Sequence, residues 1–357
     1  MATPATPVPA SDIDKPPHSR RWIPLSLTMF VALLGVTAFW SSVRVYRQHV
    51  AIREIVKDSG AYQTRNGGPD WLRQWIGDKR MEVFDEVTEV YLGDGGHKHS
   101  KVRFQPQGSG FGGRLGGPYS KFNDSGLASL GCLRDVEVLV LDGTQITDGG
   151  LSCLASLKKL KRLSIARTQV TDSGLPQLRK LTNLEALSLA EIRITDLGLQ
   201  QLIGMRYLKE LDLSRTQVCD DGLVHLKDIQ TLVSITLNET SVTGTGLVHI
   251  EGLKNLRMLD LAATRIDDDN LAFLRGFNNL EFLGLSRTGI TDDGLQHLER
   301  LNSLQSLDLE WTQVEDPGLV RLRETRNLRD LTAKSTLVTD EGIERIQRER
   351  PEMKIYR

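Results

Sequence analysis

A period of 24 residues runs through the C-terminal part of the chain and constrains its fold more than any other feature. Nine rows of this length align without an insertion or deletion, starting at Leu133, Leu157, Leu181, Met205, Ile229, Leu253, Phe277, Leu301 and Thr325. A fixed period in this range is typical of solenoids, in which each repeat buries its apolar face only by stacking on its neighbours. The sequence therefore predicts one elongated array over residues 133–348.

The order of apolar residues within a repeat predicts its secondary structure. Each row follows L-x-x-L-x-x-L-x-L-x-x-T-x-V/I-T-D-x-G-L-x-x-L, as residues 157–178 show. Leu163 and Ile165, two apart, alternate as in a strand, whereas Leu175 and Leu178, three apart, begin a helical stripe. We number positions from the first residue of each repeat. Every repeat is expected to be a strand followed by a helix.

Two recurring polar features have a structural interpretation. Thr171 and Asp172 lie just before the predicted helix, where both side chains can accept hydrogen bonds from its free N–H groups. Threonine occupies position twelve of every repeat except the one that carries Ile192. A column of hydroxyls there is expected to satisfy backbone groups of neighbouring turns.

The L-x-x-L-x-L-x-x-T core followed by T-D-x-G-L-x-x-L resembles the cysteine-containing subtype of leucine-rich repeats found in F-box substrate receptors. It is also similar to membrane-anchored bacterial leucine-rich-repeat proteins. The resemblance implies an α/β horseshoe with parallel strands on the concave face, helices on the convex face, and a protein partner bound on the concave side. No segment before the repeats reads as an F-box, so a ubiquitin-ligase role is not carried over.

The segments that flank the array are expected to cover its open ends, as terminal segments of solenoids do. Residues 84–132 are interpreted as a degenerate first repeat interrupted by a Gly-rich insertion at 93–120. Residues 41–83 are expected to form a juxtamembrane helix and an N-terminal cap, with helical spacing of apolar residues at 70–84. Residues 349–357 are predicted to be a C-terminal capping strand.

Residues 22–40, WIPLSLTMFVALLGVTAFW, contain no charge and have tryptophan at both ends. This pattern favours a transmembrane helix with its aromatic rings in the headgroup region; a cleaved secretory signal is the alternative. Residues 1–21 are rich in proline and poor in large apolar side chains, so they are predicted to be a disordered tail. Arg20 and Arg21 favour a single-pass membrane protein whose C-terminal domain lies outside the cytoplasm.

Composition argues against several functions. A net charge of -1 gives no overall attraction to nucleic acid. The three cysteines have no C-x-x-C spacing, and His97 and His99 do not lie in a cluster of acidic or cysteine residues, so no metal site is expected. Gly108–Gly113 matches G-x-G-x-x-G, but no helix-forming run follows it. We therefore expect no small-molecule cofactor.

The predicted concave face divides into two halves. Position eleven reads Arg167, Glu191, Arg215 and Glu239 in the N-terminal half, and these alternating charges are expected to pair laterally. The C-terminal half combines large apolar side chains with a glycine notch between carboxylates. Its candidate partner-binding residues are Met258, Asp260, Phe282, Gly284, Arg287, Asp308 and Trp311. The alternative is that Arg287 simply stacks on Trp311.

These observations favour a membrane-anchored protein-interaction module that binds a protein on its concave face, and not an enzyme. The bilayer itself is a second partner, through residues 22–40. Two other hypotheses stay open: an exported enzyme subunit with its chemistry in the Gly-rich insertion, and a structural envelope protein. A carboxylate pair formed by Asp260 and Asp308 is the only catalytic arrangement that the concave face suggests, and an open sheet is a poor host for it.

Overall fold

The computed structural model describes residues 43–58, 61–65, 86–93 and 120–357. The chain divides into two compact units, Met1–Arg44 and Val45–Arg357. The predicted tail 1–21, the span 22–40, the cap helix at 70–84 and nearly all of the insertion 93–120 lie outside the described residues. No helix within the described ranges has both the length and the hydrophobicity needed to cross a bilayer.

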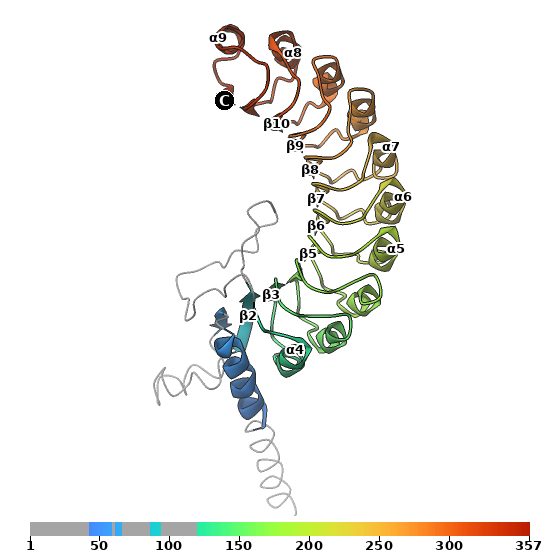
Figure 1. The fold of residues 1–357 in the computed structure, drawn as a ribbon, viewed down its shortest axis with the longest axis vertical. Helices are drawn as coiled ribbons and strands as arrows, with labels where there is room; N and C mark the ends of the chain where they lie inside the picture. Colours follow the sequence, from blue (N-terminus) through green and yellow to red (C-terminus); the bar gives the residue numbers. More distant parts are fainter. Residues whose placement is uncertain (1–42, 59–60, 66–85, 94–119) are drawn as a thin grey trace, which may run out of the picture. The chain divides into compact units, whose positions relative to one another are not determined.

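One sheet of twelve strands runs through the second unit, and its strands follow one another in chain order. β1 (Ala61–Arg65) is antiparallel to β2 (Glu86–Gly93), and every later pair is parallel. The repeats contribute β3 (Val138–Asp142), β4 (Arg162–Ser164), β5 (Ala186–Ser188), β6 (Glu210–Asp212), β7 (Ser234–Thr236), β8 (Met258–Asp260), β9 (Phe282–Gly284), β10 (Ser306–Asp308) and β11 (Asp330–Thr332). The strands line the inner side of the curved repeat region and the helical turns its outer side (Figure 1).

The outer side is built from short helical segments, several of which are 3-10 helices. They are α4 (Asp124–Leu130), η2 (Gly150–Ser156), η3 (Leu175–Lys180), α5 (Asp196–Leu199), η4 (Gln200–Leu202), α6 (Asp220–Leu223), η5 (Val224–Leu226), α7 (Gly244–Leu247), η6 (Asp269–Gly276), η7 (Gly294–Arg300), α8 (Asp316–Arg321), η8 (Leu322–Glu324) and α9 (Asp340–Glu349). The expected helices are thus present but shorter and more tightly wound. A 3-10 turn rises about 2.0 Å per residue, so it spans the repeat with fewer residues.

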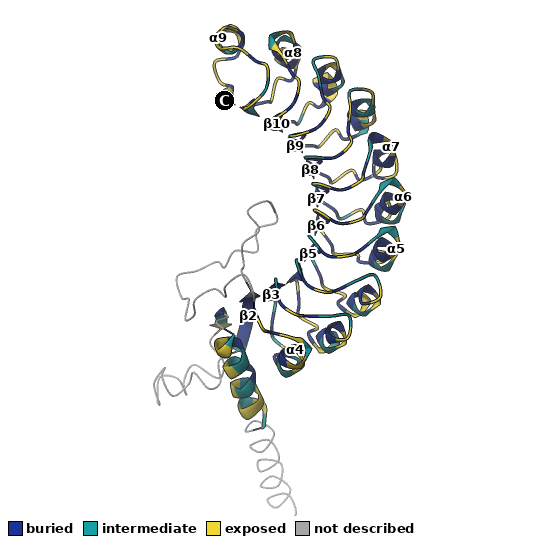
Figure 2. Cartoon of the chain, viewed as in Figure 1, coloured by how far each residue is buried: buried dark blue, intermediate teal, exposed yellow. Residues whose placement is uncertain are grey.

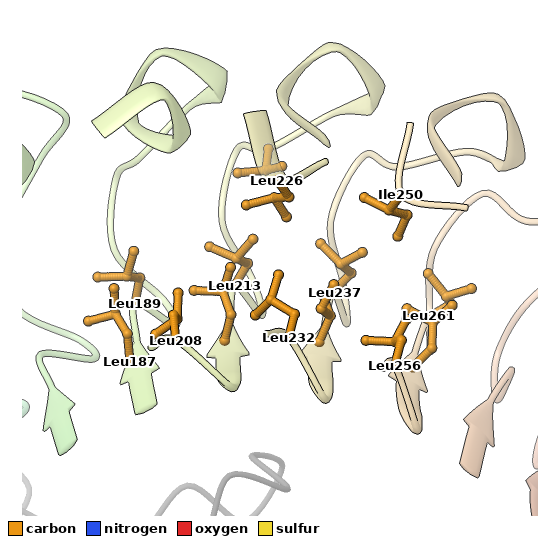
Figure 3. Packing of buried hydrophobic residues seen from close by; sticks show 14 of the residues in the cluster. Leu187, Leu189, Leu208, Leu213, Leu226, Leu232, Leu237, Ile250, Leu256 and Leu261 are labelled. Carbon is orange, nitrogen blue, oxygen red and sulfur yellow. The ribbon is translucent and has the colours of Figure 1, made fainter. Parts of the chain in front are cut away.

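Leucines from every repeat share one continuous core. Leu187, Leu211 and Leu259 on the strands are fully buried. Leu213 and Leu237, each two residues after a buried strand residue, are fully buried as well. Figure 3 shows Leu187, Leu213 and Leu237 of three successive repeats packed one after another along the core, and buried residues recur in every turn of the solenoid (Figure 2). A single repeat would leave these leucines exposed to water, so the core forms only when neighbouring repeats stack.

The aspartate of each Thr-Asp pair binds the next repeat. Asp172 Oδ1 accepts a hydrogen bond from the Thr195 N–H at 2.9 Å, and its Oδ2 accepts one from the Thr195 hydroxyl at 2.7 Å. Threonine caps its own helix, since the Leu197 N–H donates to Thr195 Oγ1 at 3.3 Å. The prediction that Asp172 caps its own helix is therefore wrong. The same inter-repeat contact is made by Asp124–Thr147, Asp148–Thr171, Asp220–Thr243, Asp268–Thr291 and Asp316–Thr339.

The glycine of T-D-x-G makes room for the carboxylate of the preceding repeat. A Cβ on Gly198 would lie 2.4 Å from Asp172 Oδ1, and one on Gly222 would lie 2.3 Å from Asp196 Oδ1. Cys219 replaces the threonine opposite Asp196 and donates its thiol to Oδ2 at 2.7 Å. This bond raises the pKa of Cys219 above its ordinary value. The threonine, aspartate and glycine positions are therefore explained by stacking between repeats.

Repeats five and six carry these side chains in a different order. Gly244 stands where the other repeats have aspartate, and Asn270 stands where they have glycine. Asn270 Oδ1 accepts from the Gly244 N–H at 3.2 Å, and a Cβ on Gly244 would lie 2.1 Å from Asn270 Cβ. The side chain between these two repeats thus comes from the later repeat instead of the earlier one. Asp267 stands at the threonine position, so a carboxylate at position 244 would also face a second carboxylate.

The position-twelve threonines bond within their own turns. Thr168 Oγ1 donates to the Ile165 carbonyl at 2.7 Å, and Thr264 Oγ1 donates to the Leu261 carbonyl at 2.5 Å. The expected column of bonds between neighbouring turns is therefore wrong. Each hydroxyl closes the turn that follows its strand, and Ile192 fills the same position as a buried apolar side chain.

The C-terminal end is closed by a strand and a buried arginine. β12 (Lys354–Tyr356) pairs in parallel with β11. The Arg350 guanidinium donates to the carbonyls of Arg323 and Thr325 at 3.2 Å, of Arg326 at 3.0 Å and of Leu328 at 2.9 Å. These bonds satisfy backbone acceptors at the junction of the eighth and ninth repeats, under the cap.

A helix at residues 43–57 closes the N-terminal end. Its Ala51 and Ile55 are fully buried in the same core as Val87 and Val90 of β2. Beyond the helix, Asp58 Oδ1 accepts from the Lys121 N–H at 3.1 Å, and the Ser120 hydroxyl donates to the same carboxylate. The helix is therefore packed against the first repeat of the second unit.

Candidate functional site

Position eleven follows each strand and has a left-handed backbone in every repeat. Only Gly143 is a glycine there, with φ 68°. The others are Arg167, Glu191, Arg215, Glu239, Ala263, Arg287, Trp311 and Ser335, with φ between 53° and 60°. L side chains adopt this region at a cost of about 1 kcal/mol or more, and bulky ones do so least readily. Glycine would be the less strained choice at these positions.

The N-terminal half of the column pairs with itself, as the sequence predicts. Arg215 donates to Glu239 at 2.7 Å and lies 3.7 Å from Glu191 on its other side. Its pKa is raised above the ordinary value chiefly by the bond to Glu239. Because each charge has an opposite charge beside it, this half presents a nearly neutral surface.

The C-terminal half of the column is different. Ala263 lies before Arg287, and Trp311 lies after it, so the column gives Arg287 no acidic neighbour. Its guanidinium carbon lies 6.0 Å from the centre of the Trp311 ring, in a cation–π contact. Trp311 is nevertheless 56% exposed, and together with Arg287 and Thr288 it lines a shallow, open depression. The stacking alternative is therefore correct about the contact, but it leaves most of the indole in solvent.

Met258 and Phe282 lie next to each other on β8 and β9, as their pairing in the sheet register shows. Both side chains are half-buried. The Ser234 hydroxyl donates to Met258 Sδ at 3.1 Å, so one side of Met258 is held by its neighbour strand. The two residues form an apolar pair where their strands begin, whereas Trp311 follows the end of β10, so the structure places the predicted apolar anchors toward opposite ends of the strands.

The predicted glycine notch is not open. A Cβ on Gly284 would lie 2.2 Å from Asp260 Oδ1, because the Asp260 carboxylate already occupies that space. Asp260 is 2% exposed and accepts from the Ala262 N–H at 3.3 Å. Asp308, which is half-buried, accepts from the Glu310 N–H at 3.0 Å. The prediction that Asp260 and Asp308 form acidic walls open to a ligand is wrong: their carboxylates fold back onto the turn after the strand.

No group of three or more histidine, cysteine or acidic residues in the described ranges could hold a metal ion. His97 and His99 lie outside those ranges. The three cysteines are free thiols and are half-buried. Sequence reasoning missed the inter-repeat role of aspartate and the capping role of Arg350. The first could have been found from the reciprocal exchange of glycine and asparagine at 244 and 270, which breaks the pattern in two neighbouring repeats at once.

Comparison with known proteins supports the class that this geometry defines. The family described as "Leucine Rich repeat" matches residues 133–155, 204–226 and 300–322, which correspond to repeats one, four and eight. These three segments are therefore similar to leucine-rich repeats, and the parallel sheet and the repeated core show a solenoid of strand–helix repeats. No curated protein matches the chain at a significant level.

Among solved structures, an internalin (inlF) from Listeria monocytogenes is similar with 20% identity and a TM-score of 0.34. The match covers 64% of this chain and 82% of the internalin. An internalin C2 from the same organism is similar with 26% identity and a TM-score of 0.40, over 53% of this chain and 76% of that one.

Proposed function

We propose that this protein is a non-enzymatic, membrane-anchored interaction module that binds a protein partner at the C-terminal half of its concave face. The observation that carries this proposal is Trp311, a bulky residue with φ 60° whose side chain is 56% exposed. The left-handed backbone is common to position eleven of every repeat, so the feature that favours a binding role is the large aromatic ring left in solvent there. Tryptophan and arginine are also the residues most enriched among interface hot spots.

The proposed surface consists of Met258, Phe282, Arg287 and Trp311, with Asp260, Gly284 and Asp308 as the layer that supports it. Its apolar pair and single guanidinium suit a partner that presents an apolar side chain beside an acidic one. The shallow depression lies open to solvent, which favours a protein surface over a small molecule. The alternative of an enzyme subunit would rest on the insertion 93–120.

The binding site is tested by crosslinking from two matched positions. A photo-crosslinking residue replaces Gln313 in repeat eight or Gln169 in repeat two, both exposed at position thirteen. We expect a discrete protein adduct from residue 313 in native cells and none of that mass from residue 169. An adduct from 169 alone, or from neither position, would place the interaction elsewhere.

Trp311→Gly is expected to change binding and stability in opposite directions. With the crosslinked partner in hand, we expect binding to weaken by about 1–3 kcal/mol because the aromatic anchor is lost. The free energy of unfolding should rise by up to about 1 kcal/mol, since glycine relieves the left-handed strain. Calorimetric affinity and urea unfolding measure the two effects. Glu239→Ala, at the same position of repeat five, is the matched control and should leave affinity unchanged. A loss of both binding and stability in Trp311→Gly would instead indicate a folding defect.

We propose further that residues 22–40 anchor the chain as a single transmembrane helix, with the repeat unit outside the cytoplasm. The charge-free run between two tryptophans supports this. The full-length protein should stay with the membrane fraction after extraction with high salt and with alkaline carbonate, because a span inserts far more strongly than a peripheral contact. Release of full-length protein by carbonate would contradict the anchor, and a shortened chain lacking residues 1–40 would indicate signal cleavage.

A further inference from the structure

Three successive loops on one rim of the solenoid carry cations and no carboxylate. They connect the helical segment of one repeat to the strand of the next, at residues 155–159, 179–183 and 203–207. Their cationic residues are Lys158, Lys159, Arg179, Lys180 and Arg206, all exposed. We call these three loops the basic rim. Its charge contrasts with the overall net charge of -1 of the chain.

Most of this charge is not neutralised locally. Lys159 pairs with Asp135 at 2.7 Å. Lys158 Nζ donates to the Lys180 carbonyl at 3.1 Å, and Lys180 Nζ donates to the Gln177 side-chain carbonyl at 2.9 Å, both uncharged acceptors. Within the described part of the chain, no ion pair involves Lys158, Arg179, Lys180 or Arg206. Like charges on adjacent loops repel one another, so an anionic partner would relieve that repulsion.

Among the equivalent loops of the later repeats, 227–231, 251–255, 299–303 and 323–327 each hold a carboxylate, and only the isolated loop 275–279 carries a cation, Arg275, without one. Loop 251–255 holds Glu251 with Lys254, and loop 299–303 holds Glu299 beside Arg300. Loop 323–327 holds an Arg323–Glu324 pair at 3.4 Å. The basic rim is therefore a property of the N-terminal repeats and not a consequence of the repeat pattern. It is also separate from Trp311, which belongs to repeat eight.

The last loop of the basic rim adds exposed apolar and aromatic side chains. Ile203 is 47% exposed and Tyr207 is 57% exposed, on either side of the buried Met205. Tyrosine is enriched at the headgroup level of membranes, where its ring is in contact with lipid and its hydroxyl with water. Lysine and arginine beside such residues are typical of surfaces that lie on anionic lipid.

The basic rim belongs to the first four repeats, at the N-terminal end of the array. The helix at residues 43–57 buries Ala51 and Ile55 in the same core as Val87 and Val90 of β2, which precede these repeats. In the sequence, this helix begins three residues after Trp40, the last residue of the predicted span.

We propose that the basic rim lies on the bilayer surface and binds the anionic headgroups of phospholipids. The proposal rests on the proposed span, because the span is what brings this rim to a membrane. Its physical basis is the attraction between a negative lipid surface and several adjacent cations, which decays within about one Debye length, roughly 10 Å at 0.1 M salt. The contact holds the solenoid by its N-terminal repeats and leaves the C-terminal concave surface free.

The test uses the full-length protein in lipid nanodiscs, either purely zwitterionic or containing about one-third phosphatidylglycerol. A water-soluble amine-acylating reagent labels lysines, and mass spectrometry gives the rate for each. We expect Lys158 and Lys180 to react about fivefold more slowly in anionic discs. The difference should disappear in 0.5 M salt, because the Debye length falls to about 4 Å there. Lys254, at the same loop position as Lys158 in a later repeat, should react equally in both discs.

Variants separate this proposal from a general charge effect. The protein should bind anionic vesicles more strongly than zwitterionic ones. This preference should be lost when glutamine replaces Lys158, Arg179, Lys180 and Arg206. The matched replacement of Lys254, Arg275, Arg300 and Arg326, cations of the same loops in later repeats, should not. Equal labelling of Lys158 and Lys180 in both kinds of disc would overturn the proposal. Co-elution with zwitterionic discs reports the span independently, so failure of the anchor and failure of the basic rim are distinguishable.

Discussion

Gly244→Asp, which restores the usual residue of the repeat pattern, is expected to lower the free energy of unfolding by about 2–4 kcal/mol. The reason is that Asn270 already fills the space: a Cβ on Gly244 would lie 2.1 Å from Asn270 Cβ and 2.7 Å from its Cα. The new carboxylate would also face Asp267 rather than a threonine hydroxyl. Urea unfolding of the full-length protein in detergent measures the change.

Two further substitutions should restore stability in steps. Asn270→Gly in the Gly244→Asp background removes the overlap but leaves two facing carboxylates, so recovery should be partial. Adding Asp267→Thr provides the N–H and hydroxyl donors that Thr195 offers to Asp172 at 2.9 and 2.7 Å, and recovery should be complete. Equal stability of the single and triple variants would mean that the inter-repeat contact does not govern this position.

Arg350→Ala is expected to destabilise the C-terminal end by about 2–4 kcal/mol. The substitution removes the guanidinium donor from the carbonyls of Arg323, Thr325, Arg326 and Leu328, at a site where Arg350 is only 9% exposed. Arg350→Lys should recover only part of the lost stability, because an ammonium group can still donate to some of these carbonyls but has fewer donors and no planar fork.

The part of the array that loses stability in Arg350→Ala shows whether Arg350 stabilises the C-terminal end or the whole array. Repeats contact mainly their neighbours, so amide exchange should accelerate in β11, β12 and α9 well before it does in β4 or β5. Arg345→Ala, exposed on the same helix α9, is the control and should leave exchange unchanged. Uniform acceleration along the whole array would contradict a local cap.

The candidate site was only partly predictable, and its failures have one cause. Exposed Trp311 and its stacking on Arg287 were foreseen from their order in neighbouring repeats. Asp260 was expected to wall a notch beside Gly284, but the sequence does not reveal which way a short carboxylate turns. The nearby Ala262 N–H donates a hydrogen bond to Asp260 Oδ1, so the carboxylate turns toward the backbone and fills the notch.

The sequence by itself determined the period, the parallel strands and the apolar core, because a repeat of fixed length with two-residue and three-residue apolar spacing has few ways to bury its leucines. Only the tertiary structure decided what the polar positions do. Asp172 and Thr195 are 23 residues apart, and stacking alone places their side chains 2.7 Å from each other. It likewise placed Asn270 over Gly244, and the Arg350 guanidinium on carbonyls more than 20 residues earlier. Hydrogen bonds require particular atoms at particular distances, and a repeat pattern specifies which residues recur but not which neighbour they reach.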